Sequence, residues 1–224
     1  MRNIIIALGE YYHIFNRGVD KRDIFGDIHD LERFMQSIRE FNTVTPIGSI
    51  YENKFQKPQL GDSVSKLQPL VEFISYCILP NHYHFILKQI HEKGIEKFIH
   101  RFALGYSMYF NKKYKRSGVL FQGAYKALHI DTNEYLLHAS AYVTFNDIVH
   151  KKWSSNSLFI RSSWPEYVEK KIDAITKNGI ILEQFNSVSE YKEFALDVVN
   201  NVRDQRKLDN IYSLDSNLET ESPS

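Results

Sequence analysis

The 224-residue chain contains one cysteine, Cys77, and so has no second thiol with which to form an internal disulfide. This scarcity excludes a disulfide-stapled domain and favours a reducing compartment. No apolar run reaches the roughly 18 residues that a membrane-spanning helix needs. The apolar stretch over residues 4–8 is too short for a typical signal peptide, and Glu10 follows it. We therefore expect a cytoplasmic protein without a membrane partner.

The chain also has little net charge, +1, but its charges are unevenly distributed. Residues 1–165 carry 21 basic and 15 acidic side chains, whereas residues 166–224 carry 7 and 12. Between Lys97 and Ile130 there are seven basic residues, eight interleaved aromatic residues and no acid. Because basic groups neutralise phosphates and aromatic faces stack on unpaired bases, this segment predicts a single-stranded nucleic-acid surface. The alternative is a solvated basic helix face whose aromatic residues belong to the core.

Length and a hydrophobic content of 43% predict one domain with an extension. We place the domain at residues 1–150, with an insertion loop at 43–69 that is rich in Pro, Gly, Ser and Gln. Residues 151–215 are expected to form a helical extension. Residues 216–224 have the composition of a disordered tail.

Periodicity in residues 1–150 indicates four strands and three helices. The strands are expected near 11–16, 70–79, 82–90 and 119–130. The helices are expected after Asp27, which is a candidate N-cap, after Gly94 and over about 132–147. The first six elements form a βαββαβ unit, which closes most simply as a ferredoxin-like antiparallel sheet with helices on one face. The predicted fold class is therefore α+β, with an additional helix and the C-terminal helical extension.

Capping signals set the expected ends of the later helices. Asp131 is predicted to cap the helix over 132–147, with Glu134 as the third residue of a capping box. A further helix is expected from Glu166 to Lys177, ended by Asn178-Gly179. The last helix should begin at Ser187 or Ser189.

Two histidines, His82 and His84, directly follow Pro80-Asn81, a pair of residues typical of a turn between strands. Residues two apart on a strand share one face, so these side chains would lie with Cβ atoms roughly 6–7 Å apart. Two imidazoles placed in this way can hold one divalent ion. The alternative is a pair of core or rim histidines.

A second group of polar residues lies on the predicted helix over 132–147. His138, Tyr142 and Asn146 recur every four residues and therefore share one face. A tyrosine with an amide one turn away has the side chains of a nucleophile and a further metal ligand. The alternative is an ordinary polar stripe on an amphipathic helix. We expect this helix to pack near the histidine-bearing side of the sheet.

Together these segments resemble the single-tyrosine HUH (IS200-like) transposases, and specifically the REP-associated tyrosine transposases. The likeness extends over nearly the whole chain, in the order and at the separations of the family. Its parts are an opening strand, the H-hydrophobic-H strand, a helix-to-strand segment, the catalytic helix and a C-terminal extension. The corresponding segments are Tyr12–Gly18, Leu79–His84, Tyr109–Gly123, Glu134–Asn146 and Ile181–Phe194.

The resemblance implies an endonuclease and strand transferase that cleaves single-stranded or hairpin DNA. It implies that His82 and His84 bind Mg²⁺ or Mn²⁺, with Asn146 as third protein ligand, and that Tyr142 is the nucleophile. The product would be a 5′-phosphotyrosine intermediate, formed by a monomer or a homodimer. We expect DNA contacts from eight residues of the basic and turn segments, namely Asn16, Arg17, Arg101, Lys112, Lys113, Arg116, Gln122 and Lys126.

Three residues depart from the family pattern. Asp147 follows Asn146 where the family usually has proline, which adds a carboxylate near the expected metal. Ala124 follows the Phe-Gln-Gly sequence where an arginine is frequent, which removes one expected DNA contact. Tyr83, between the two histidines, is bulky but still hydrophobic.

Two other functions are compatible with the same sequence. The first is a catalytically idle module that recognises DNA or RNA hairpins, which would bind without cleaving. The second is a metal-dependent phosphodiesterase that uses water as nucleophile, for which the Tyr142 hydroxyl would be dispensable. Detection of a covalent protein–DNA adduct separates both from the transposase-like enzyme.

Overall fold

A computed structural model describes residues 5–53, 68–149, 158–169 and 174–204 of the chain. Its strands are β1 (Tyr11–Arg17), β2 (Val71–Leu79), β3 (His82–Gln89), β4 (Lys126–Ile130) and β5 (Arg161–Ser162). Its longer helices are α1 (Ile28–Phe41), α3 (Gly94–Lys113), α4 (Asn133–Thr144) and α8 (Val188–Asp204). The short helices are η1 (Val19–Lys21), α2 (Ile50–Asn53), α5 (Asn146–Val149), α6 (Trp164–Val168) and α7 (Gly179–Leu182).

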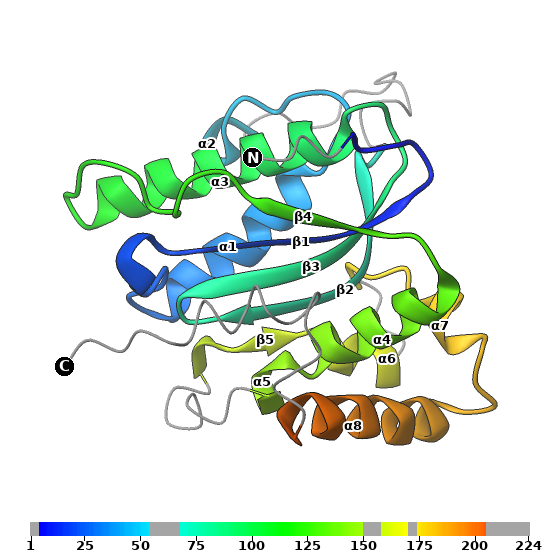
Figure 1. Ribbon diagram of the computed structural model, residues 1–224. Helices are drawn as coiled ribbons and strands as arrows, with labels where there is room; N and C mark the ends of the chain where they lie inside the picture. The colour runs from blue at the N-terminus through cyan, green and yellow to red at the C-terminus, as the bar shows by residue number, and fades with distance from the viewer. Residues whose placement is uncertain (1–4, 54–67, 150–157, 170–173, 205–224) are drawn as a thin grey trace.

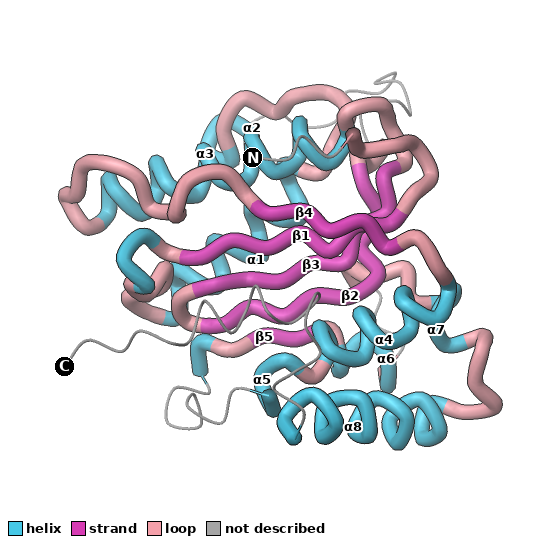
Figure 2. The backbone as a smooth tube through the Cα atoms, in the orientation of Figure 1, coloured by secondary structure: helices cyan, strands magenta, loops and turns pink. Residues whose placement is uncertain are grey.

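The five strands form one antiparallel sheet in the order β4-β1-β3-β2-β5 (Figure 2). Its first four positions have the order expected of a ferredoxin-like βαββαβ unit, which confirms the predicted fold class. The turn at Pro80-Asn81 joins β2 to β3, as predicted. Strand β3 is central and pairs with β1, so the two histidines lie in the middle of the sheet.

The sheet is covered by helices on both faces, with α1 and α3 on one and α4 and α8 on the other (Figure 1). Alternation along β3 explains how one strand serves both layers. Tyr83, Phe85 and Leu87 belong to the core beneath α1 and α3. Ile86 belongs to the core beneath α4 and α8, and His82 and His84 share its side of the strand.

Helices α1 and α3 are packed closely and joined by polar contacts. Asp27 caps α1 as predicted, and forms a full capping box with the buried Asp30. Gly105 of α3 lies against the ring of Phe41, where any side chain would collide with that ring. These contacts hold the first layer of helices against the sheet.

The helix after β4 packs on the histidine-bearing face, as predicted, but its ends differ from the prediction. The N-cap of α4 is Thr132, whose hydroxyl accepts from the backbone N–H of Tyr135, and not Asp131. The helix ends at Thr144, and α5 begins separately at Asn146.

The strand predicted over 119–130 is shorter in the structure and begins only at Lys126. The preceding segment crosses the end of β1, where Phe121 pairs with Gly18 in an isolated bridge. Gly123 has a φ of 64°, a left-handed conformation that turns the chain before β4 can start. The chain at Gln122-Gly123 is therefore a turn that leads into β4 and not part of that strand.

The C-terminal extension contains a strand as well as helices. Strand β5 pairs with β2, and α8 packs against α4. The prediction of a helix from Glu166 to Lys177 is wrong, because α6 ends at Val168. Glu166 instead accepts hydrogen bonds from the backbone N–H groups of Ile175 and Thr176, which are extended beside β2. The helix predicted from Ser187 or Ser189 is confirmed as α8.

Part of the insertion predicted at 43–69 is helical, since α2 lies within it. Residues 54–67 of that insertion, the segment 150–157 and the predicted tail over 216–224 fall outside the described residues. Within the part of the chain that the structure describes, no helix is both long and apolar enough to span a bilayer.

Candidate active site

The two strand histidines are buried on the face of the sheet that α4 covers. His82 is 7% exposed and His84 is fully buried. Their ring centroids lie 5.2 Å apart with the ring planes nearly perpendicular, at 85°. The alternation predicted from the sequence therefore brings the two imidazoles together on one face.

The tautomer of His82 is determined by its neighbour Asn81. Nδ1 of His82 lies 2.5 Å from Oδ1 of Asn81. The amide nitrogen of Asn81 donates to the carbonyl of Lys21 at 3.0 Å, and since a carbonyl can only accept, Oδ1 must face the histidine. An amide oxygen also only accepts, so Nδ1 of His82 carries the proton. In the neutral ring, Nε2 is then the nitrogen with a lone pair.

A third histidine, His13 of β1, was not predicted as part of the site. Its Nε2 lies 2.9 Å from Nδ1 of His84, and both side chains are buried. The sequence does hold a signal, because His13 alternates with Tyr11 and Phe15 on a predicted strand beside that of the histidines. The register needed to see the contact, with Phe15 opposite His84, comes only from the structure.

Tyr142 reaches His84 from α4. Its side chain is 2% exposed, and its ring centroid lies 6.2 Å from that of His84, edge to face at 88°. The residues of this contact belong to one chain, so no second copy is needed to bring the phenol to the strand. Helix α4 holds this position because its other side packs against α8.

Asn146 is the first residue of α5, separated from α4 by Phe145, and is fully buried. Neither its amide oxygen nor its amide nitrogen has a hydrogen-bond partner among the described residues. Its neighbour Asp147 lies beside Cys77, the residue that pairs with His84 across β2 and β3. Burial raises the pKa of the Cys77 thiol well above its ordinary value, and the charge of Asp147 raises it further.

These residues fit a divalent ion only as a mixed set of ligands. Within the described ranges, no three His, Cys, Asp or Glu side chains come together in a metal-binding arrangement. A buried amide without a partner is costly unless something binds it, and its oxygen is a ligand that Mg²⁺ and Mn²⁺ accept. The unpartnered amide of Asn146 is thus a candidate third donor, and its position as a ligand beside His82 and His84 stays a prediction.

Four of the eight residues expected to contact DNA come together in the structure. Arg17 hydrogen-bonds through Nε to Oε1 of Gln122, and Asn16 donates to the carbonyl of Gly123 at 3.3 Å. A cavity of about 120 Å³, which we call the β1 pocket, is lined by Phe15, Asn16, Arg17, Gln122, Ala124 and Lys126. Phe15 stacks on His84 with ring centroids 5.5 Å apart, so this pocket adjoins the histidines.

The other four expected DNA contacts lie on α3 or just beyond it, each in a different setting. Arg101 donates to the carbonyl of Thr43 at 2.6 Å. Lys113 lies 2.7 Å from carboxylate oxygens of both Asp27 and Asp30. Arg116 lies over the ring of Phe110, and Lys112 is exposed. These four side chains therefore have different neighbours, and their contact with DNA stays a prediction.

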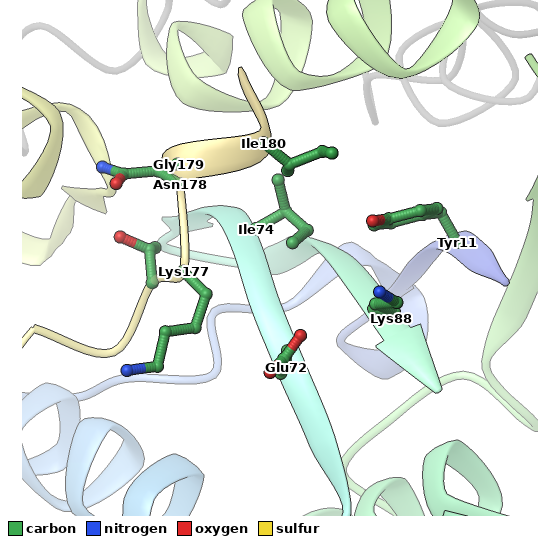
Figure 3. Close-up of a pocket in the computed structure, with 9 residues that line it drawn as sticks. Tyr11, Glu72, Ile74, Lys88, Lys177, Asn178, Gly179 and Ile180 are labelled. Atoms are coloured by element: carbon green, nitrogen blue, oxygen red, sulfur yellow. The ribbon is translucent and has the colours of Figure 1, made fainter. Parts of the chain in front are cut away.

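A larger cavity, of about 420 Å³, lies at the far end of the same sheet face (Figure 3). Nζ of Lys88 lies 5.3 Å from the centre of the Tyr11 ring. Lys88 on β3 is opposite Glu72 on β2. The loop before α7 closes the other side with Lys177 and Asn178. Neither Tyr142 nor the histidines contribute to this cavity.

His138, one turn before Tyr142, has a structural contact. Its ring meets that of Phe194 on α8 edge to face, with centroids 5.3 Å apart. The polar stripe predicted on this helix therefore divides, with His138 against α8 and Tyr142 against the sheet.

The fold and site define a class of protein, in which a ferredoxin-like sheet presents two histidines to a tyrosine on a covering helix. Residues 64–146, which include His82, His84, Tyr142 and Asn146, match the family model described as "Transposase IS200 like". The match confirms the predicted resemblance to the IS200-like transposases over these residues.

A search of solved structures found a similar chain, described as the structure of a REP-associated tyrosine transposase bound to a REP hairpin. The two chains are 13% identical, and the similarity covers 75% of this chain and 84% of that one, with a TM-score of 0.45. A search of the curated proteins found no match.

Proposed function

We propose that the protein is a metal-dependent endonuclease and strand transferase that cleaves single-stranded or hairpin DNA through Tyr142. The observation that carries this proposal is the edge-to-face contact of Tyr142 with His84, at 6.2 Å between ring centroids within one chain. A nucleophile and a candidate metal ligand from different elements meet there in a buried site. The match of residues 64–146 to the IS200-like transposases supports the same reaction class.

Each residue has a definite part in the proposed reaction. His82, His84 and Asn146 would hold Mg²⁺ or Mn²⁺, and the protein places Tyr142 beside them. When bound, the ion polarises a phosphoryl oxygen and offsets the charge that develops in the transition state. The Tyr142 oxygen forms a bond to phosphorus as the bond to the 3′ oxygen breaks. The phenol loses its proton to solvent, and the leaving oxygen takes one up to become a 3′-OH.

The product keeps the energy of the broken phosphodiester bond in the 5′-phosphotyrosine bond. A 3′-OH from another strand can therefore attack it and restore the tyrosine without ATP. The β1 pocket supports the choice of DNA as substrate, because Arg17 and Lys126 supply positive charge next to the histidines. Asn16 and Gln122 supply neutral hydrogen-bonding groups in the same pocket.

The test is a covalent adduct assay with labelled hairpin DNA and Mn²⁺. Tyr142→Phe should abolish the adduct and leave hairpin binding intact, because it removes only the nucleophilic oxygen. Tyr135→Phe on the same helix is the matched control and should leave the adduct unchanged. Burial, followed by the charge of Asp131, raises the pKa of Tyr135 to about 12, which makes its phenol a poor nucleophile at neutral pH.

The burial of the site favours a second candidate function, which is a hairpin-binding module without catalysis. Tyr142 is only 2% exposed and His84 is fully buried, so a scissile phosphate must displace covering groups to reach them. Hairpin binding with no adduct under either ion would establish the binding module. Cleavage that persists in Tyr142→Phe would instead identify a hydrolase that uses water.

A further inference from the structure

The two strand histidines have the same hydrogen-bonding pattern on their Nδ1 atoms. Nδ1 of His82 contacts the amide oxygen of Asn81, and Nδ1 of His84 contacts Nε2 of His13. The two neighbours come from different elements, since Asn81 lies in the β2–β3 turn and His13 lies on β1. In each case the contact leaves Nε2 as the ring nitrogen facing away from that neighbour.

One proton lies between His13 and His84, and its position decides what His84 can do. If His13 donates, Nδ1 of His84 holds the lone pair and its Nε2 carries the proton, which prevents Nε2 from binding a cation. If His84 donates, Nε2 keeps its lone pair and can bind a cation. His82 already has the second arrangement, because its partner Asn81 can only accept.

We propose that His13 is a positioning residue that accepts the Nδ1 proton of His84 and so commits the Nε2 lone pair of His84 to the candidate metal site. This inference rests on the proposed function and concerns how its site is prepared. A neighbour that accepts from the second nitrogen of a metal-binding histidine fixes both the tautomer and the orientation of the ring.

Burial supports this role for His13. His13 is 2% exposed and His84 is fully buried, so water does not readily supply an alternative acceptor. The His13 ring also lies 4.9 Å from the Phe15 ring, which in turn stacks on His84. The three rings therefore hold one another in place on the α4 side of the sheet.

The proposal is tested first on the metal-free protein, by two-bond proton–nitrogen NMR of the histidine rings. His84, identified by the loss of its signals in His84→Gln, should carry its proton on Nδ1, as should His82. His13→Gln places an amide oxygen near the position of Nε2 and should keep this tautomer. His13→Phe keeps a ring but removes the acceptor, and should move the proton of His84 to Nε2.

Finding the His84 proton on Nε2 in the wild-type protein would overturn the proposal, and this measurement needs no variant to fold. Conversely, an Nδ1 proton on His84 that persists in His13→Phe would show that His13 does not set the tautomer, which also overturns it.

The second test measures Mn²⁺ affinity from the electron paramagnetic resonance signal of the free ion. His13→Phe should weaken binding by about 10–100-fold, and His13→Gln should restore most of the loss. Hairpin binding in EDTA should not change in either variant. Wild-type affinity in His13→Phe would overturn the inference alone, whereas wild-type affinity in His82→Ala would overturn the proposed metal site itself.

Discussion

At the scale of single residues, Asn146 stands out in the site because both polar atoms of its side chain lack a hydrogen-bond partner among the described residues. It is fully buried at the start of α5, and no described group hydrogen-bonds to its amide. Leaving a buried polar group unsatisfied costs about 1–3 kcal/mol. A residue that lowers stability in the metal-free protein is expected where its side chain serves binding.

We therefore predict opposite effects of Asn146→Leu on stability and on ion binding. The free energy of unfolding in EDTA, measured in urea, should stay the same or rise by about 1 kcal/mol, because the unsatisfied amide is removed. Mn²⁺ binding should be lost together with the covalent adduct. A large loss of stability with unchanged Mn²⁺ affinity would assign Asn146 a purely structural role.

Much of the residue pattern at the site could be predicted from spacing alone. His82 and His84 share a face because they are two apart on a strand, and Tyr142 meets His84 because its helix covers that face. His13 was missed because its partner is 71 positions away, and the contact depends on the register of β1 against β3. The sequence likewise marks Lys113 as basic but does not show that Asp27 and Asp30 hold it.

At the scale of elements, one buried carboxylate joins the start of α1 to the end of α3. Asp30 accepts from the backbone of Gly26 and from the hydroxyl groups of Tyr109 and Tyr114. It also pairs with Lys113 at 2.7 Å. We call these contacts the Asp30 cluster. They satisfy a charge that could not otherwise be buried.

The ionised state of Asp30 stabilises the folded protein. Burial alone would raise the pKa of Asp30, but hydrogen bonds from Lys113, Tyr114 and other groups hold it below its ordinary value. A carboxyl whose pKa is lower in the folded state stabilises the fold above the unfolded pKa of about 3.9. That stabilisation is lost as the pH falls through the folded value.

We predict that Asp30→Asn lowers the free energy of unfolding at pH 7 by about 2–3 kcal/mol, because Lys113 and two hydroxyls lose a charged partner. The variant should also lose less stability than the wild type between pH 5 and pH 2, as measured by urea unfolding. Glu32→Gln on the exposed face of α1 is the control and should change the free energy of unfolding at pH 7 by less than about 0.5 kcal/mol. Equal acid sensitivity of Asp30→Asn and wild type would contradict this account.

Elements with strong local signals could be predicted closely, and those shaped by distant contacts could not. Strands β2 and β3 and the cap of α1 follow from alternation and from Asp27. The short β4 could not be predicted, because it depends on the bridge between Phe121 and Gly18. The early end of α6 depends on Glu166 binding backbone groups 9 and 10 residues further on.

At the scale of the whole molecule, the sheet and α8 enclose α4 as a middle layer (Figure 1). The helix that carries Tyr142 is therefore packed on both sides. Two cationic side chains, Arg17 and Lys126, instead line the β1 pocket, which adjoins His84 through Phe15. The near-zero net charge of the chain conceals this arrangement, since the acidic excess lies in residues 166–224.

We predict that the salt dependence of hairpin binding depends on the β1 pocket. Arg17→Gln and Lys126→Gln should each weaken binding and reduce the slope of log affinity against log salt by about 1, because each removes one phosphate contact. Lys97→Gln is the control, since its ammonium group donates to the carbonyl of Glu92 away from the pocket. An unchanged slope in the Arg17 variant would place the DNA elsewhere.

The β2–β3 turn connects the two halves of the candidate site, which are the β1 pocket and the histidine pair. Pro80 and Asn81 are hydrogen-bonded through their backbone carbonyls to Ile24 and Gly18, and the Asn81 side chain holds both Lys21 and His82. The segment that follows Arg17 is thus tied directly to one imidazole. Any shift that a bound strand imposes on this segment would be transmitted to His82 and so to the candidate metal site. Linkage then requires occupancy of either half to alter the affinity of the other by the same factor.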